Sequence, residues 1–589
     1  MRIRCLFLIV FQFVALFCLA QTIPAERLVD WSNAGFEYNA MEATSILNFL
    51  DEGGDNTGFH SNTERLNTLL ATHSKDSLLI FFPNGNYFFD APILLQDNVF
   101  LQGESADSTQ FIFDLDGQGN LITAQGNTTA DTTFVAKEIP FLSNSLDVYN
   151  PTLFAVGDLV QLIENDNALV ASNWAIGSTG QVFVIAAIEG KQVVLASEIR
   201  RHYDLANAPY LQKIAPIQNV GIEQISIQRL DQTEAQTSHI LFDRAHHCWV
   251  KCVASYNCNF AHVDIRRSHQ VSVLDSYFKD AFDYGGGGKA YGVVLHFATS
   301  DCLIGNNSFE HLRHSMLLQA GANGNVLSYN FSQQPFWTDV SLPSNSAGDL
   351  VLHGNYPYAN LLEGNVVQNI VIDDSHAQNG PLNTFFRNRA DLYGIFMNNG
   401  MPTDQQNFIG NEVTNSGFLL GNYILAGTNH YEYGNHIVGD TVPVPFEGLS
   451  LFSLYLGENP TFLDANAFPP IGFPNDLGEH SIAAQERVLS GQLTACSLDT
   501  TTSVGPISLE AALPISLFPN PAKDFFQINI HSPTTIVVQK MDLFASNGTL
   551  VKTAKNKTLF DISDLPQGVY FVKIQFSNDH IQIKKLLRF

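Results

Sequence analysis

Six asparagines recur at near-constant spacing through the middle of the chain. Each lies in a similar local frame, such as LIGNNSF or LLEGNVV, and the gaps between them are 23, 35, 23, 23 and 24 residues: Asn307, Asn330, Asn365, Asn388, Asn411 and Asn435. A fixed period with a polar residue at one phase is typical of a solenoid, and a period of about 23 residues suits one coil of a parallel β-helix. Asparagine tolerates the left-handed backbone of a sharp turn, and its amide can bond to the asparagine one coil away. The sequence therefore predicts a parallel β-helix with an asparagine ladder.

The N-terminus reads as a secretory signal over residues 1–20. Arg2 and Arg4 precede an apolar run that ends at Leu19, and we expect cleavage after Ala20. The run is too short for a typical membrane-spanning helix, and no later segment reads as one. Removing the two arginines takes the formal net charge from −27 to −29. Such a charge disfavours nucleic acid and anionic membrane surfaces as partners and suits an exported protein.

Five cysteines follow the signal, in an odd number and without the spacing of a disulfide framework: Cys248, Cys252, Cys258, Cys302 and Cys496. This pattern argues against a disulfide scaffold, so no disulfide is predicted, although two pairs could form. Cys248 and Cys302 occupy similar phases of the repeat. We therefore expect these two to stack inside the solenoid as small apolar residues.

The N-terminal part of the chain carries a family resemblance. A helix-like stretch (TGFHSNTERLNTLLATH) is followed by IFFPNGNYFF, ILLQDNVFLQGES and TQFIFD, which are β-rich segments broken by turn residues. Over about residues 28–126 this order resembles the cap and first coils of pectate-lyase-like right-handed β-helix proteins. The segments SLYLGENPTFL and FPPIGFPNDL resemble the closing end of the same family. The resemblance implies an all-β fold, a right-handed single-stranded parallel β-helix, and an acidic polysaccharide as the class of substrate.

The β-helix is expected in two parts, with an insertion between them. Residues 21–126 are the N-terminal cap and first coils, and residues 216–496 are the remaining coils and the closing cap. Between them, residues 127–215 break the repeat. The segments FAVGDLVQLIEND and GQVFVIAAIEGKQVVLASEI read there as strands and hairpins of a small inserted β-unit.

The C-terminus has a different character again. Residues 497–513 are rich in Thr and Ser and read as a linker, and residues 514–589 read as alternating strands with tight turns. The Pro519–Ala522 entry, the Asn547-Gly548 hairpin, LPQGVY and the terminal lysines resemble the C-terminal sorting domain of type IX secretion substrates. The resemblance implies a β-sandwich, the type IX secretion machinery as partner, and a protein secreted or attached to the cell surface. An immunoglobulin-like adhesive tail is the alternative.

The ladder also gives the register of other residues in the coils. Ser276 takes the ladder phase one coil before Asn307. Eleven or twelve residues before Ser276 and before the next four ladder positions, the chain has Asp264, His296, Gln319, His353 and His376. These residues should form a column on one sheet. Because ionisable groups inside a narrow apolar core would be costly, we expect the column to face outward along a groove. A purely structural histidine ladder is the alternative.

The local charge around this column favours a sugar-acid substrate. Residues 239–314 hold 8 of the 18 histidines and balance acidic with basic side chains, in a protein that is otherwise acidic. Elimination from a uronate needs a cation to neutralise the carboxylate and a base to remove the adjacent proton, whereas hydrolysis needs two carboxyl groups. The pattern therefore favours a polysaccharide lyase.

The candidate residues follow from these needs. The base would be His353 or His296, the neutralising cation Arg313 or Arg267, and the acid His314. Residues expected to orient these groups or to bind sugar are Asp264, Gln319, His376, Arg266, Lys289, Arg387, Arg389, Trp337 and Tyr356. Asp373 and Asp374 are candidates for holding a cation, and a calcium requirement stays open.

Two other functions remain open. A glycoside hydrolase would use two of Asp264, Glu310, Asp373 and Asp374 on the same groove. A non-catalytic adhesin or glycan-binding protein would use the solenoid only as a surface. No catalytic motif of a known family matches residue by residue, so the resemblance carries fold and substrate class alone. We expect a monomer, because the solenoid supplies its own core and caps.

Overall fold

The computed structural model describes residues 23–36, 43–338, 347–397, 401–445, 449, 451–456, 469–496, 515–518, 522–530, 537–545, 550–577 and 581–588. The chain forms two compact units, residues 1–498 and 499–589. The expected signal peptide (1–20) and linker (497–513) lie outside the described residues. None of the described helices is long and apolar enough to cross a membrane.

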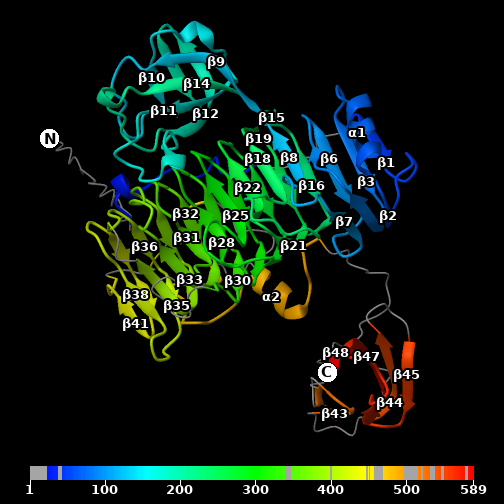
Figure 1. Ribbon diagram of the computed structural model, residues 1–589. Coiled ribbons are helices and arrows are strands. Elements are labelled where there is room, and N and C mark those ends of the chain that lie inside the picture. Colours follow the sequence, from blue (N-terminus) through cyan, green and yellow to red (C-terminus); the bar gives the residue numbers. More distant parts are fainter. Residues whose placement is uncertain are drawn as a thin grey trace, which may run out of the picture. The chain divides into compact units, whose positions relative to one another are not determined.

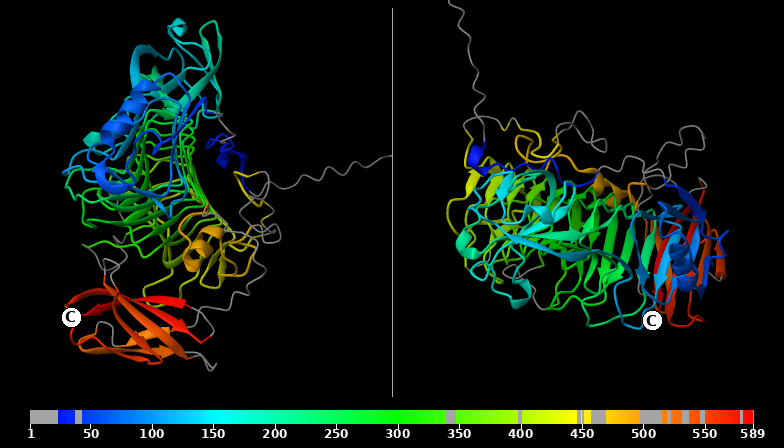
Figure 2. Two further views of the ribbon diagram at one scale, coloured as in Figure 1. Left: turned by 90° about the vertical axis from the view of Figure 1, so that its right-hand side faces the viewer. Right: turned by 90° about the horizontal axis from the view of Figure 1, so that it is seen from above.

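Most of the first unit is a parallel β-helix whose coils stack along one axis (Figures 1 and 2). The prediction of this fold class is confirmed. Successive coils contribute short strands to three faces, and the left view of Figure 2 looks at the stack from the end that carries α1 (Thr63–Thr72). Each strand pairs in parallel with its counterpart one coil away, so the coils hold one another by backbone hydrogen bonds.

The first face is a sheet of twelve strands: β1 (Ser45–Asn48), β3 (Leu78–Phe82), β6 (Val99–Gly103), β16 (Gly221–Glu223), β20 (Trp249–Lys251), β23 (Ser272–Leu274), β26 (Leu303–Gly305), β29 (Val326–Ser328), β32 (Leu361–Glu363), β34 (Thr384–Phe386), β36 (Asn407–Ile409) and β39 (Tyr431–Tyr433). The second face contains β2 (Thr57–Ser61), β4 (Gly85–Phe89), β7 (Thr109–Phe113), β17 (Ser226–Arg229), β21 (Ala254–Cys258), β24 (Tyr277–Ala281), β27 (Ser308–Glu310), β30 (Phe331–Gln333), β37 (Glu412–Val413) and β40 (Asn435–Ile437). The third face contains β5 (Ile93–Leu94), β8 (Ile122–Gln125), β18 (Ile240–Asp243), β22 (Ala261–Arg266), β25 (Tyr291–His296), β28 (His314–Leu318), β31 (Leu350–Leu352) and β38 (Asn422–Ile424). The long strands β33 (Val366–Ile372) and β35 (Arg389–Met397) belong to both the second and third faces. A small parallel pair, β15 (Ile217–Gln218) with β19 (Ala245–His246), lies at a turn, and β41 (Asp440–Val442) runs antiparallel to β40.

The asparagine ladder is present and buried. Asn307 Nδ2 donates to Asn330 Oδ1 at 3.0 Å, and the same bond repeats along the ladder at 2.9–3.1 Å down to Asn435. All six side chains are fully buried. The left-handed backbone, however, belongs to the residue before each ladder position: Asn306, Tyr329, Gly364, Arg387, Gly410 and Gly434. The preceding residue makes the sharp turn, while the ladder side chain bonds its neighbours.

A second ladder, which sequence analysis missed, runs beside the first. The side-chain amides of Asn325, Asn360, Asn383 and Gln406 form a chain of hydrogen bonds at 2.9–3.0 Å. The interior of the coils is apolar, and rings of successive coils stack there, as Phe385 does on Phe408 at 5.0 Å. Cys248 and Cys302 are buried in this core as free thiols, as we expected.

The end of the first unit runs back along the β-helix. Helix α2 (Ala483–Ser490) packs against β27 and β30, and Arg487 donates to Asn306 Oδ1 at 2.9 Å. Beyond it, Cys496 forms a disulfide with Cys252, with the Cα atoms 5.6 Å apart. The expectation of no disulfide was therefore wrong. Because the two cysteines are 244 residues apart and meet only when the terminal segment returns, their spacing carries no local signal.

The insertion is an antiparallel sheet with its own apolar core (Figure 1). Its strands, in the spatial order β10-β13-β12-β11-β14-β9, are β9 (Asn127–Phe134), β10 (Ser145–Asp147), β11 (Leu159–Ile163), β12 (Gln181–Glu189), β13 (Gln192–Leu195) and β14 (Tyr210–Ala215). Single 3₁₀ turns lie at η1 (Ala25–Arg27) before the β-helix and, within the insertion, at η2 (Pro151–Leu153), η3 (Asn173–Ala175) and η4 (Leu205–Asn207).

The second unit is a small β-sandwich. One sheet contains β42 (Ile515–Phe518), β43 (Phe525–Ile530) and β46 (Leu559–Asp561), and the other contains β44 (Val538–Ala545), β45 (Leu550–Lys555), β47 (Gly568–Phe576) and β48 (Ile581–Arg588). All pairings between these strands are antiparallel. Phe526 and Phe560 stack at 5.4 Å in the core between them.

Candidate functional site

Strand alternation on the third face turns polar side chains outward. In β22, Val263 and Ile265 lie in the apolar core, which leaves Asp264 and Arg266 on the outer surface of the sheet. In β25 the same alternation places Leu295 inside and His296 outside. The outward orientation expected for the column therefore follows from the burial of the intervening residues.

The register of the sheet gives the members of the column. Arg266 pairs with His296, and the pairings of the preceding residues align His296 with Gln319, His353 and Asp373 on successive coils. Neighbouring members are thus about 4.8 Å apart. Asp264 is offset by one side chain, because it pairs with Val294. His376 comes after the end of β33. The spacing from the asparagine ladder therefore predicted the wrong residue at both ends of the column.

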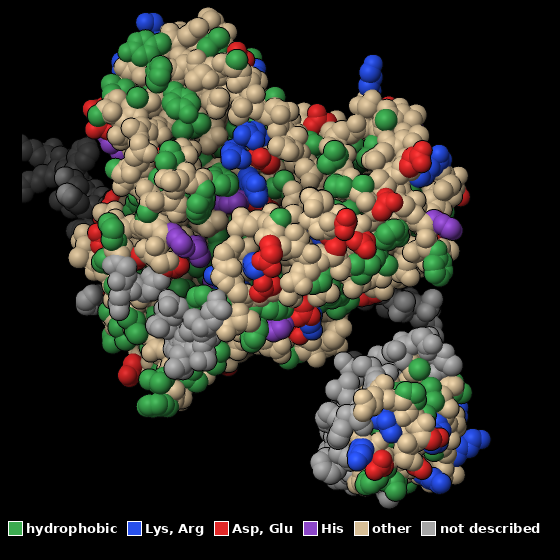
Figure 3. Space-filling view, viewed as in Figure 1, with side chains coloured by type: hydrophobic (Ala, Val, Ile, Leu, Met, Phe, Trp, Pro, Cys, Tyr) green, Lys and Arg blue, Asp and Glu red, His purple; other side chains and the backbone are tan. Residues whose placement is uncertain are grey.

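These side chains line a cavity of about 470 Å³ on the third face. Its lining includes six of the residues expected from the sequence: Arg266, His296, Arg313, Gln319, His353 and His376. The other lining residues are Trp174, Gln236, Phe260, Gly287, Gly288, Tyr291 and Phe297. In Figure 3, Lys/Arg and His side chains gather on the β-helix just below the insertion. The structure therefore brings together most of the expected bases and cations.

At one end of the cavity, His296 belongs to a buried ionic cluster. Its Nε2 lies 2.7 Å from Asp264 Oδ1, and Arg266 Nε donates to both oxygens of the same carboxylate at 3.0–3.1 Å. Burial alone would raise the pKa of Asp264, but His296 and Arg266 outweigh it and lower that pKa to about 2. Burial also lowers the pKa of His296, despite the carboxylate beside it. Asp264 thus fixes the ring of His296, and its own carboxylate oxygens are already bound by His296 and Arg266.

At the other end, His353 lies between an acid and a second imidazole. Its Nε2 is 3.6 Å from Asp373 Oδ2, and its ring stacks on that of His376 with centroids 4.9 Å apart. Its Nδ1 is buried and has no hydrogen-bond partner among the described residues. Burial lowers the pKa of His353 to about 4, against the opposing effect of Asp373. His353 is therefore neutral near pH 7.

Arg313 brings a positive charge to the same end of the cavity. Its Nη1 donates to Gly285 O at 2.9 Å, and its guanidinium lies 4.7 Å from the centre of the Trp337 ring and 5.8 Å from that of Tyr291. Burial raises the pKa of Tyr291, so its phenol stays protonated at neutral pH. Trp337 thus supports the cation from outside the cavity lining.

Three further expected residues lie next to the cavity without lining it. His314 Nδ1 donates to Gly348 O at 3.0 Å, and burial, followed by the charge of Arg313, lowers the pKa of His314 well below its usual value. Arg267 pairs with Asp243 at 3.1 Å and lies over the Phe297 ring. Lys289 is held by ion pairs with Glu234 and Asp283 at the end of the glycine-rich loop.

Four other expected residues have structural contacts elsewhere. Arg387 donates to the backbone of the closing segment, and Arg389 pairs with Glu412 at 2.6 Å. Tyr356 is half-buried beside Arg201. Asp374 accepts from Thr403 N at 3.0 Å and from Asn379 Nδ2 at 2.8 Å inside a turn. None of these four residues belongs to the cavity lining.

One group of side chains at the edge of the cavity could hold a cation. Donor atoms of His353, Asp373 and His376 all lie within 4.8 Å of one another. Two imidazoles with one carboxylate suit zinc or a similar transition metal, whereas calcium prefers six to eight oxygen ligands. Of the two expected metal candidates, only Asp373 belongs to this group.

Sequence analysis missed several lining residues. Tyr291 could have been found, because it begins the same strand that ends at His296. Trp174 belongs to the insertion, 122 positions before His296, and its phase cannot be read from the ladder. Phe260, Phe297 and Gln236 carry no signal in the repeat. The assembled cavity offers imidazoles, fixed cations and a phenol, which is a set suited to proton transfer beside a bound anion.

Comparison with known proteins finds matches to two separate parts of the chain. Residues 46–152 match the family described as rhamnogalacturonase A/epimerase, pectate lyase-like, and residues 516–588 match the secretion system C-terminal sorting domain. The chain therefore combines a pectate-lyase-like β-helix with a sorting domain at its C-terminus. That domain marks it for type IX secretion to the cell surface or the extracellular space. The two parts together indicate an exported carbohydrate-active or glycan-binding protein.

Among solved structures, phage tailspikes resemble the fold. The tailspike of Acinetobacter baumannii bacteriophage AP22, in complex with a capsular saccharide, has 13% identity and a TM-score of 0.43, over 66% of this chain and 69% of that chain. The tailspike of Pseudomonas phage LKA1 has 15% identity and a TM-score of 0.46, over 62% of this chain and 64% of that chain. The tailspike of Pseudomonas phage phi297 has 12% identity and a TM-score of 0.38, over 66% and 75%. None of the curated proteins compared matches this chain.

Proposed function

We propose that the protein cleaves a uronate-containing polysaccharide by β-elimination in the third-face cavity. The observation that supports this reaction is the composition of the described lining, which has imidazoles, guanidinium groups, two amides and aromatic rings but no carboxylate. Elimination requires a cation and a base, whereas hydrolysis requires a pair of carboxyl groups across the bond. The lining meets the first requirement.

Arg313 is the group that would neutralise the substrate carboxylate. It lines the cavity, is mostly buried, and has an Nε with no hydrogen-bond partner among the described residues. A charge-assisted bond to a carboxylate is about twice as strong as a neutral one and draws electron density from the sugar acid. This makes the proton at C5 more acidic. Arg267, the other expected cation, is already paired with Asp243.

His353 is the better of the two expected bases. Its Nδ1, although buried, has no hydrogen-bond partner among the described residues, and Asp373 lies where it can orient the ring and stabilise the imidazolium. His296 has one ring nitrogen committed to Asp264. In the reaction His353 takes the C5 proton, the electron pair forms the C4–C5 double bond, and the C4–oxygen bond breaks. Tyr291, whose phenol is protonated, donates the proton to the leaving oxygen; we assign it this role in place of His314.

The contacts of the other carboxylates weaken the hydrolase alternative. Asp264 is fully buried and held by Arg266 and His296. Glu310 lies on the second face and pairs with Lys279 at 2.7 Å. With Asp374 inside its turn, Asp373 is the remaining one of the four hydrolase candidates beside the cavity. A single acid cannot supply both roles of a glycosidase.

The test uses the mature chain with polygalacturonate, alginate, hyaluronan and a neutral xylan, with calcium or with EDTA. Ultraviolet absorbance of the unsaturated uronate and release of reducing ends are followed together. Both signals rising on an acidic glycan is the expected result. Reducing ends without absorbance would mean hydrolysis, and binding without either signal would mean a non-catalytic glycan-binding protein.

Two substitutions then test the assignment of roles. His353→Ala should lower kcat by about 10²- to 10⁴-fold, the usual contribution of a general base. Arg313→Ala should lower kcat/KM by about 10- to 100-fold, and Arg313→Lys should restore part of it, since a charge-assisted bond contributes about 1.5–3 kcal/mol. The exposed His60→Ala variant is the matched control. Near-normal turnover by both the His353 and Arg313 variants would refute the assignment.

A further inference from the structure

The insertion contributes one aromatic side chain to the cavity. Trp174 lies on η3, is 50% exposed and lines the cavity together with residues of the β-helix. Its ring meets that of Phe297 edge-on, with centroids 5.9 Å apart, and Phe297 directly follows His296. A large apolar face is therefore held open to solvent beside the polar column.

The loop that carries Trp174 is fixed at both ends. The Asp166 carboxylate accepts from Gly177 N at 2.8 Å and from Thr179 N at 2.9 Å. Asn355, on a turn of the β-helix, accepts from the backbone N–H groups of residues 171–172 at 3.0 and 3.2 Å. The position of the indole is thus set by hydrogen bonds from the insertion and from the β-helix.

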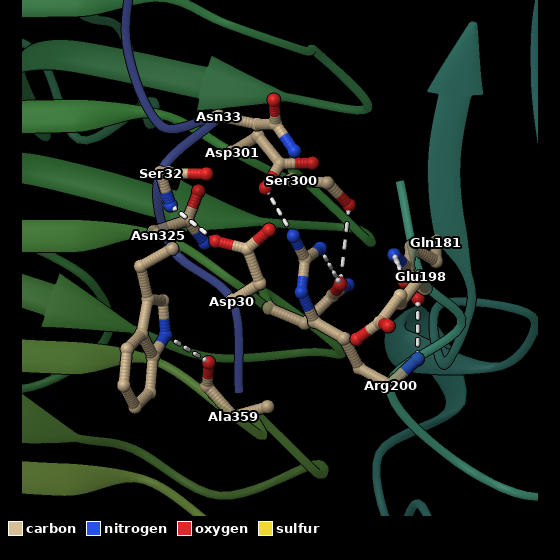
Figure 4. A network of polar contacts seen from close by, with 12 residues as sticks. Asp30, Ser32, Asn33, Gln181, Glu198, Arg200, Ser300, Asp301, Asn325 and Ala359 are labelled. Atoms are coloured by element: carbon tan, nitrogen blue, oxygen red, sulfur yellow. Dashed lines mark hydrogen bonds and ion pairs between the residues drawn. The ribbon is translucent and has the colours of Figure 1, made fainter. Parts of the chain in front are cut away.

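The insertion as a whole is also anchored to the β-helix. The Arg200 guanidinium reaches out of the insertion to form a fully buried ion pair with Asp301, and it donates to Asn323 Oδ1 at 3.2 Å (Figure 4). Tyr358 OH donates to Gly180 O at 2.9 Å, close to the same loop. A buried ion pair with these additional bonds is a specific connection that would be costly to break. The insertion therefore holds Trp174 in a fixed position at the cavity.

We propose that Trp174 is a sugar-binding subsite, on which the pyranose ring next to the reacting uronate stacks. The apolar C–H face of a sugar ring matches the flat face of an indole, and a pre-positioned aromatic ring loses little entropy on binding. The lining also includes small or flexible groups, Gly287, Gly288 and Gln236, which leave room for a ring. The inference rests on the proposed function for the identity of the glycan. It assigns to the insertion the role of selecting which sugar follows the cleaved bond.

The test measures binding separately from cleavage, in the full mature chain that carries His353→Ala. Affinity for polygalacturonate, alginate and hyaluronan is measured by calorimetry and by affinity electrophoresis. Trp174→Ala should weaken binding of the recognised glycan by about tenfold, and Trp174→Phe should retain most of it. Tyr149→Ala, which removes an exposed aromatic ring elsewhere on the insertion, should bind like its parent. Thermal unfolding confirms that the variants fold.

Each result has a separate meaning for the two proposals. Cleavage and binding that are both unaffected by Trp174→Ala would overturn the subsite and leave the lyase standing. Binding without cleavage by the chain with His353 intact, still weakened by Trp174→Ala, would overturn the lyase and support the subsite. Failure of all three polysaccharides to bind would overturn the subsite.

Discussion

The asparagine ladder makes a quantitative prediction for Asn365→Ala. Asn365 Oδ1 accepts from Asn330 N at 3.0 Å and from Asn330 Nδ2 at 2.9 Å, while Asn365 Nδ2 donates to Leu327 O at 2.8 Å and to Asn388 Oδ1 at 2.9 Å. The substitution leaves the buried Asn330 N–H without its acceptor, at about 1–3 kcal/mol, and removes three other bonds that contribute about 0.5–1.5 kcal/mol each. We therefore expect the free energy of unfolding to fall by about 3–7 kcal/mol.

Asn365→Asp separates hydrogen bonding from volume. The side chain keeps its shape, but its second oxygen then faces Leu327 O and Asn388 Oδ1, which are both acceptors. A loss at least as large as that of the alanine variant is expected, because a buried charge whose second oxygen faces only acceptors is costly. The exposed Asn167→Ala variant should change the free energy of unfolding by no more than about 0.5 kcal/mol.

The assay for these variants is guanidinium unfolding followed by tryptophan fluorescence. The chain has four tryptophans, all in the first unit, so the signal reports the β-helix and its insertion rather than the C-terminal sandwich: Trp31, Trp174, Trp249 and Trp337. A midpoint for Asn365→Ala equal to that of Asn167→Ala, with an unchanged slope, would refute the reasoning. The ladder would then be a consequence of the fold and not a contributor to its stability.

Three further predictions concern the insertion, the buried histidines and the cavity. Arg200→Ala removes the guanidinium that pairs with the buried Asp301 and leaves that carboxylate with His269, 3.3 Å away, so we expect a loss of about 3–5 kcal/mol in the free energy of unfolding, together with weaker glycan binding. Burial lowers the pKa of His262 to about 3, whereas the unfolded side chain titrates near 6.5. The unfolded state thus binds more protons between these values, and stability should fall as the pH drops from 6.5 toward 3, less steeply in His262→Gln. Added zinc should inhibit cleavage reversibly, because His353 and His376 would bind it, whereas calcium should not compete.

Matched controls keep these predictions specific. Lys213→Ala breaks a partly exposed ion pair of the same insertion and should cost no more than about 1 kcal/mol. His60→Gln removes an exposed histidine and should leave the pH dependence of unfolding unchanged. Equal losses for Arg200→Ala and Lys213→Ala would contradict the anchoring role. Stability that falls equally with pH in His262→Gln and in the unsubstituted chain would contradict the prediction for His262. Cleavage that is unchanged by millimolar zinc would contradict the prediction for the cavity.

The sequence predicts those features that repeat. The ladder asparagines, the apolar core with Cys248 and Cys302, and the outward histidine column all follow from a fixed period and strand alternation. Features that depend on chain segments returning from a distance were not predictable in this way. The disulfide between Cys252 and Cys496 and the placement of Trp174 beside Phe297 are of this kind.

The predicted alignment of Asp264 with His296 was wrong, and the reason bears on the site. Arg266 and not Asp264 pairs with His296, because the number of residues between the third face and the ladder differs from coil to coil. The core fixes only the length of the strands and their turns. Any extra residues in a coil must therefore leave the stack as loops, and loops are where binding residues concentrate.

The departures from the 23-residue period point to the same cavity. The interval from Ser276 to Asn307 is 31 residues and contains the glycine loop with Gly287 and Gly288. The interval from Asn330 to Asn365 is 35 residues and contains Trp337, which lies under Arg313. Both loops enter before third-face strands, while the insertion leaves after β8 on the opposite edge of that face. In a solenoid of this kind the regular coils build the platform, and the irregular ones show which face binds.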